Sequence, residues 1–205
     1  DNESYTDLAG NNGPAATTAN YKVDTIPPAV DNFTMSDTEL KIGDNATVTL
    51  IFSEAVTNFT NADITVDNGS LSTMTSPNGD NVTWTGTFTP TANAEDATNT
   101  LSLEINSYTD LAGNDGPDNR TANFEINTLG PTISSVAITS SSGKQNNFLN
   151  AGDNVSMTVT YSETVILDNT GGPPVLTIVV GSTERETTYI TGSNSDNLTF
   201  LYTIQ

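Results

Sequence analysis

Residues 43–56 read GDNATVTLIFSEAV, and this stretch decides the class of fold. After a Gly-Asp-Asn turn, apolar side chains stand at every second position: Ala46, Val48, Leu50 and Phe52. A period of two between apolar and polar residues predicts a β-strand with one buried face. The same alternation recurs at residues 82–88, 101–105 and 122–126, with weaker strand signals at 30–35, 62–66 and 71–75. The chain is therefore predicted to be all-β.

The sequence also repeats itself. Residues 4–25 read SYTDLAGNNGPAATTANYKVDT and residues 107–128 read SYTDLAGNDGPDNRTANFEINT, with 14 of 22 positions identical at an offset of 103. The opening stretch returns as GDNVSMTVTYSETV at residues 152–165. A period of about 100 residues is typical of tandem sandwich domains and too long for a solenoid. We predict the C-terminal end of a preceding repeat at 1–25, a complete repeat at 26–128, and a truncated repeat of a related subtype at 129–205.

The complete repeat holds about seven strand signals separated by turn sequences, which is the number that an immunoglobulin-like sandwich needs. The predicted fold is thus a series of tandem immunoglobulin-like β-sandwiches, each of about seven antiparallel strands. Trp84 is expected to be the bulkiest residue of the core, because it lies in a strongly alternating strand. Tyr108 is expected to be a corner tyrosine whose hydroxyl bonds back to the backbone.

Composition and charge exclude several classes of function. The chain has 25 acidic and five basic residues, a net charge of −20, so binding to nucleic acid is not expected. It has no Cys and no His, which removes disulfides, thiol nucleophiles and imidazole bases. No run of 18 apolar residues occurs, so direct membrane insertion of this segment is not expected. Glu54 and Asp110 could formally be the carboxylate pair of a glycoside hydrolase. Because a small sandwich without His offers little beyond these carboxylates, the chain is predicted not to be an enzyme.

Three recurring motifs carry a resemblance to a known family. They are the linker VDTIPP at 23–28, echoed as INTLGP at 126–131; the strand end FSEAV at 52–56, echoed as YSETV at 161–165; and DLAGN at 7–11 and 110–114. Their order and spacing resemble the bacterial immunoglobulin-like tandem repeats of giant surface adhesins, including RTX-type and biofilm-associated proteins. The resemblance implies an exported protein at the bacterial cell surface, flanked by further immunoglobulin-like repeats of the same chain. In some members calcium sits near the domain junctions.

The positions of the acidic residues also predict a metal site independently of the family resemblance. In an immunoglobulin-like sandwich the chain enters at the pole where the loops after the second and sixth strands lie. That pole should gather Asp24, Glu54 and Asp110, with Asn114 behind them. Gathered like charges destabilise a fold unless something neutralises them, and Ca²⁺ prefers oxygen ligands of this kind. The alternative is that Asp110 caps a tight turn and that Glu54 ends a strand.

Equivalent positions elsewhere are weaker candidates for the same role. Glu163 and Asn127 correspond to Glu54 and Asp24, so a third-repeat site is expected to be weaker or absent. Asp7 occupies the place of Asp110 in the first segment but lacks partners there, and it too has the alternative of capping a turn.

The leading functional hypothesis is a structural extender, a stalk repeat of an adhesin that calcium stiffens at domain junctions and that supports cell adhesion or biofilm formation. The alternatives are a carbohydrate- or surface-binding module and an accessory domain of a secreted hydrolase. A binding module should show an exposed aromatic platform or a flat array of Thr residues. The sequence leaves the distal target of such an adhesin open.

Overall fold

The computed structural model describes residues 5–205, and its internal contacts divide the chain into two units. The first unit ends at Thr128 and the second unit is Leu129–Gln205. Residues 1–4, which belong to the predicted end of a preceding repeat, lie outside the described residues. The contacts group the described part of segment 1–25 with the first unit, and its assignment to a preceding repeat stays a prediction.

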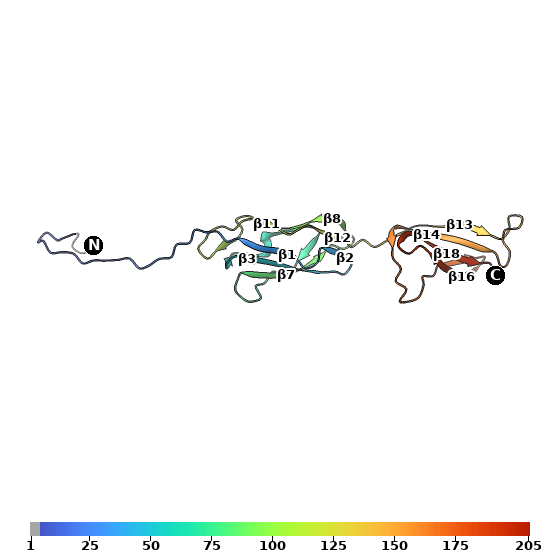
Figure 1. Ribbon diagram of the computed structural model, residues 1–205, viewed down its shortest axis with the longest axis horizontal. Helices are drawn as coiled ribbons and strands as arrows, with labels where there is room; N and C mark the ends of the chain where they lie inside the picture. Colours follow the sequence, from blue (N-terminus) through green and yellow to red (C-terminus); the bar gives the residue numbers. More distant parts are fainter. Residues whose placement is uncertain (1–4) are drawn as a thin grey trace. The chain divides into compact units, whose positions relative to one another are not determined.

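One layer of the first unit is a four-stranded antiparallel sheet in the order β1-β3-β7-β6 (Figure 1). Its strands are β1 (Val30–Met35), β3 (Ala46–Phe52), β7 (Thr83–Pro90) and β6 (Gly69–Leu71). β3 follows the alternation of its sequence, since Ala46, Val48, Leu50 and Phe52 are buried and the residues between them are exposed or partly buried. The buried face of β3 therefore forms part of the core.

The opposite layer consists of two three-stranded pieces, β2-β12-β8 and β11-β9-β5. Their strands are β2 (Glu39–Lys41), β12 (Phe124–Asn127), β8 (Glu95–Asn99), β11 (Asn119–Arg120), β9 (Leu101–Leu103) and β5 (Ile64–Val66). Only Thr100 separates β8 from β9 in the chain, so the two pieces meet there. A short ribbon of β10 (Thr109–Asp110) and β4 (Val56–Thr57) and a 3₁₀ turn, η1 (Asn61–Asp63), complete the unit.

Side chains from both layers of the first unit form one core. Its largest fully buried members include Tyr108, Phe52, Phe88 and Phe124. Aromatic pairs link the layers, since the rings of Phe88 in β7 and Phe124 in β12 lie 5.2 Å apart in an edge-to-face arrangement. Edge-to-face pairs of this kind add stability beyond the apolar area that they bury.

The structure confirms the all-β, immunoglobulin-like sandwich and corrects some details. The strand expected at 62–66 begins with the η1 turn, and the strand expected at 101–105 ends at Leu103, leaving Ile105 exposed. β2 and β8 were not predicted, because neither carries a clear apolar alternation. Trp84 is only partly buried and packs against Phe59 at the margin of the core, so the prediction that it is the bulkiest core residue is wrong.

The second unit has a sheet in the order β13-β14-β18-β17 and a separate hairpin, β15-β16. Its strands are β13 (Ile133–Ser142), β14 (Asn154–Val165), β18 (Ser195–Thr203), β17 (Thr188–Thr191), β15 (Thr177–Val180) and β16 (Thr183–Glu186). Within it, β14 takes the place of β3, and Val155, Met157 and Val159 are buried as Ala46, Val48 and Leu50 are. Its buried residues form two small clusters instead of one continuous core.

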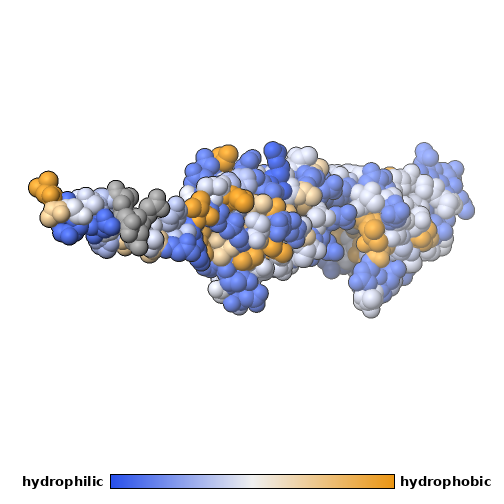
Figure 2. Space-filling view, turned by 60° about the vertical axis from the view of Figure 1, so that its left-hand side comes forward, coloured by the Kyte–Doolittle hydropathy of each residue, from blue (hydrophilic) through white to orange (hydrophobic). Residues whose placement is uncertain are grey.

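The molecular surface is largely polar. On the face drawn in Figure 2, isolated hydrophobic patches interrupt a surface that is otherwise hydrophilic or neutral. Across residues 5–205 we find no helix whose length and hydropathy would suit a membrane span.

Candidate metal centre

The centre of the candidate site is Asp110 in β10, at the start of a tight turn. Its Oδ1 atom accepts hydrogen bonds from the backbone N–H groups of Ala112 at 2.8 Å, Gly113 at 2.7 Å and Asn114 at 2.9 Å. Its Oδ2 atom accepts one from the Asn114 side-chain amide at 2.7 Å. The Asn114 amide, together with the three backbone N–H groups, holds the pKa of this buried carboxyl below its usual value, although burial acts in the opposite direction.

This turn is encoded locally, because the chain forms it twice. In the first segment, Oδ1 of Asp7 accepts from the N–H groups of Ala9 and Asn11, each at 2.9 Å, and Oδ2 accepts from the Asn11 amide at 2.8 Å. Gly10 and Gly113 both adopt positive φ, at 89° and 93°, a conformation that glycine accepts without strain. Five residues therefore suffice to pre-arrange the carboxylate.

A tyrosine closes each copy of the turn. Tyr108 donates a hydrogen bond from its hydroxyl to the carbonyl oxygen of Pro117 at 2.9 Å, and Tyr5 does the same to Pro14 at 2.9 Å. Burial, with a smaller effect from Asp118, raises the pKa of Tyr108 to about 12, so this hydroxyl keeps its proton at neutral pH. The expected bond from Tyr108 to the backbone exists, and its acceptor lies nine residues downstream.

The loop after β3 brings the second carboxylate to the turn. β10 pairs with β4, with Asp110 opposite Val56, so the Asp110 turn lies beside the loop that carries Glu54. Ser53, the residue before Glu54, forms two hydrogen bonds with Ala29 of the linker. Its Oγ accepts one from the N–H of Ala29 at 2.9 Å, and its own N–H donates one to the Ala29 carbonyl oxygen at 2.9 Å. This serine clamp, which the sequence analysis missed, fixes the linker next to Glu54.

The serine clamp has a counterpart that marks it as a recurrent feature. In the second unit, Oγ of Ser162 accepts from the N–H of Thr132 at 3.0 Å, and the N–H of Ser162 donates to the Thr132 carbonyl at 2.8 Å. The signal was present in the sequence, since both serines precede a Glu in the repeated strand end. It could not be interpreted until the partner residue was known.

Asp24 supplies the third carboxylate from the linker. One carboxylate oxygen from each of Asp24, Glu54 and Asp110 lies within 4.8 Å of the other two. Asp24 is exposed, Glu54 is partly buried and Asp110 is buried, so the group opens toward solvent. Asn114 lies behind this group and donates weakly, at 3.4 Å, to the carbonyl oxygens of Asp24 and Ile26.

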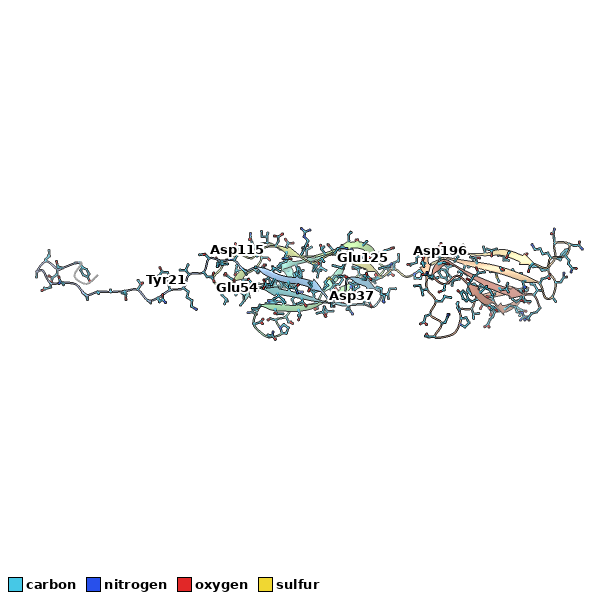
Figure 3. All side chains as sticks on the ribbon, in the orientation of Figure 1. Tyr21, Asp37, Glu54, Asp115, Glu125 and Asp196 are labelled. Carbon is cyan, nitrogen blue, oxygen red and sulfur yellow. The ribbon has the colours of Figure 1, made fainter. Side chains whose placement is uncertain are left out.

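Figure 3 shows Glu54 and Asp115 at one end of the first unit, with Asp37 and Glu125 toward the other end. Lys22 lines the same open surface pocket as Asp24 and Glu54, and the sequence analysis did not include it. Among the described residues that line this pocket, Lys22 is the one with a basic side chain.

The donor set suits a hard divalent cation such as Ca²⁺. Two oxygens that share a Ca²⁺ ion at about 2.4 Å lie at most about 4.8 Å apart, and the three oxygens of this group satisfy that condition. A carboxylate offers about four lone-pair sites, so Oδ2 of Asp110, with one hydrogen bond accepted, retains a position for a cation.

The other candidate residues do not join a comparable group. Asp7 forms its turn but belongs to no three-carboxylate group; among residues 5–205 the one such group is that of Asp24, Glu54 and Asp110. Glu163 lies within β14, which runs on to Val165, so it does not follow a strand end as Glu54 does. Asn127 is the last residue of β12 in the first unit.

A family profile described as the bacterial Ig-like domain matches residues 24–126, just over half of the chain. The matched segment begins at Asp24 and contains Glu54 and Asp110. Comparisons with curated proteins and with solved structures return no match.

Proposed function

The chain belongs to the bacterial Ig-like domain family, and on that premise we propose that it is a structural extender of an exported surface adhesin, stiffened by Ca²⁺ where the linker enters the sandwich. In this role the repeats hold a distal binding domain away from the cell and support adhesion or biofilm formation. The observation that carries the proposal is the group formed by Asp24, Glu54 and Asp110. Its three members come from the linker and from two loops of the sandwich.

The linker has an anchored part and an exposed part, which gives the ion a mechanical role. Pro28 is buried, and Ala29 is held by the serine clamp, so the chain is anchored from Pro28 onward. Before Pro28 the residues from Pro14 to Pro27 are exposed and form no helix or strand. Asp24 lies in this exposed part, which weak hydrogen bonds from Asn114 reach at the carbonyl oxygens of Asp24 and Ile26. A cation bridging Asp24 to Glu54 and Asp110 would remove much of the remaining hinge freedom. A shorter free segment makes a stiffer junction.

The alternative of a carbohydrate- or surface-binding module has less support. Trp84, the single Trp, packs its ring against Phe59 at a centroid distance of 4.9 Å instead of presenting a free platform. An accessory role beside a hydrolase depends on neighbouring domains and is not favoured by any residue of this chain.

A mobility measurement at the linker tests the proposal. Because the chain has no Cys, Thr25→Cys gives a single attachment point for a nitroxide label next to Asp24 in the exposed part of the linker. We expect Ca²⁺ to broaden the electron paramagnetic resonance spectrum of this label relative to chelator. The same label in an Asp24→Asn background should not respond. Asp115→Asn is the matched control, since it removes a carboxylate outside the group and restores the Asn found at position 12 of the first copy. An unchanged spectrum in Ca²⁺ contradicts the proposal.

A further inference from the structure

Asn114 connects the Asp110 turn to the linker through one amide group. Its Nδ2 atom donates to Oδ2 of Asp110 at 2.7 Å and to the carbonyl oxygens of Asp24 and Ile26, both at 3.4 Å. A side-chain amide nitrogen carries two protons, so one proton serves Asp110 and the two linker carbonyls share the other. The same amide thus contacts the turn after β10 and a linker about 90 residues earlier in the chain.

The turn by itself fixes the orientation of this amide. An ionised carboxylate can only accept hydrogen bonds, so the nitrogen of the amide must face Oδ2 of Asp110 and the amide oxygen must turn away from it. The copy of the turn in the first segment has the same arrangement, since Nδ2 of Asn11 donates to Oδ2 of Asp7 at 2.8 Å. Local structure therefore presents the donor of Asn114 whether or not the linker lies beside it.

The linker is shaped to accept hydrogen bonds from this amide. The N–H of Ile26 donates to Oδ1 of Asp24 at 3.2 Å, which closes an Asx turn over residues 24–26. Pro27 follows directly and restricts the backbone of Ile26, so few conformations remain open to these three residues. In the conformation of the structure, both linker carbonyl oxygens lie within reach of Asn114. A constrained acceptor thus meets a donor whose orientation is already set.

We propose that Asn114 is a positioning residue that holds the linker on the sandwich without any metal, and that it thereby sets the affinity of the three-carboxylate group for Ca²⁺. The claim about affinity rests on the proposed calcium-stiffened role, whereas the claim about the linker rests on the hydrogen bonds alone. A linker held by Asn114 keeps Asp24 beside Glu54 and Asp110 before an ion binds, so less conformational freedom is lost on binding. Because an N–H group cannot coordinate a cation, Asn114 acts through Asp24 and not as a ligand.

The nitroxide label at Thr25→Cys, measured in chelator, tests the claim about the linker apart from any metal. Asn114→Ala should sharpen the spectrum and raise the ratio of mobile to immobile label about fivefold, as the loss of one hydrogen bond would. Asn11→Ala is the matched control, because it makes the same change in the copy of the turn, and it should leave the spectrum unaltered. Trp84 fluorescence verifies that each variant is folded. An unaltered spectrum in folded Asn114→Ala overturns the proposal.

A second variant separates positioning from direct coordination of the ion. Asn114→Asp introduces a carboxylate, which binds Ca²⁺ better than an amide does, but it removes both N–H donors. We expect this variant to be as mobile in chelator as Asn114→Ala. Tighter Ca²⁺ binding by Asn114→Asp, combined with unchanged mobility in chelator, would show that Asn114 is a ligand and would overturn the proposal.

Calcium titrations of the same label test the claim about affinity. Asn114→Ala keeps all three carboxylates and should raise the dissociation constant for Ca²⁺ about fivefold. An unchanged dissociation constant contradicts this claim while leaving the calcium-stiffened role intact. A chain whose label never responds to Ca²⁺ refutes that role and the claim about affinity together, and the comparison in chelator still decides whether Asn114 holds the linker.

Discussion

Calcium should raise the thermal stability of the first unit, and removing one carboxylate should be slightly stabilising in chelator but destabilising in Ca²⁺. The perturbation is Asp24→Asn, which deletes the exposed member of the three-carboxylate group. In chelator the variant should melt slightly above the unchanged chain, because one of three crowded like charges is gone. In Ca²⁺ it should melt well below the unchanged chain, because the ion loses a ligand.

The size of the calcium effect follows from mass action. Sites in extracellular modules bind Ca²⁺ with dissociation constants of about 10⁻⁴–10⁻³ M. At about 10 mM Ca²⁺ a site at the tight end is stabilised by about 2.7 kcal/mol, and one at the weak end by about 1.4 kcal/mol. For a domain of about 100 residues the tighter value raises the melting temperature by roughly 10–20 °C.

The fluorescence of Trp84 isolates the first unit in this assay, because it is the only Trp in the chain and lies in β7. Melting curves are recorded in Ca²⁺ and in chelator for the unchanged chain, Asp24→Asn and the control Asp115→Asn. The control should keep the full calcium shift. Equal melting temperatures in the two buffers, or a calcium shift in Asp24→Asn as large as in the unchanged chain, would refute the reasoning.

Three further outcomes follow from the Asp110 turn and can be measured by the same fluorescence signal. The pKa of Asp110 is lower in the folded state than its unfolded value near 3.8, so the ionised carboxylate stabilises the fold above that pH, and this stabilisation is lost as the pH falls through the folded-state pKa. Asp110→Asn should therefore flatten the acid part of the curve of stability against pH. A curve that the substitution leaves unaltered would contradict this reasoning. Tyr108→Phe removes the bond to Pro117 and should lower the free energy of unfolding in urea by about 1 kcal/mol, whereas an unchanged midpoint would show that this bond is not stabilising. Gly116→Ala places a methyl group against the Tyr108 ring and should cost about 1–3 kcal/mol, so a variant of normal stability would show that the ring moves aside freely.

Local sequence determined the Asp110 turn and most of the strands. The turn forms twice with the same bonds, because an Asp, a Gly and an Asn within five residues satisfy one another without help from the rest of the chain. The limits of β3 agree with the alternation of apolar residues, since a strand with one buried face must place apolar side chains at every second position, and β1 coincides with the weaker strand signal at 30–35. The family resemblance to bacterial immunoglobulin-like domains was also visible in the order of short motifs, although the adhesin setting stays a proposal.

Only the tertiary structure decided which strand edges pair, and the meeting of Asp24, Glu54 and Asp110 followed from the expected fold, not from local sequence. β8 reads EDATN and has only Asn99 buried, so it is a strand because β12 lies beside it, not because of its own pattern. Glu54 and Glu163 occupy the same motif, yet β3 ends before Glu54 whereas β14 continues through Glu163. Strand length depends on pairing with distant segments, and sequence periodicity carries no information about those partners. For the same reason the approach of Asp24 to Glu54 and Asp110 depends on the β4–β10 pairing and the serine clamp, contacts that span tens of residues.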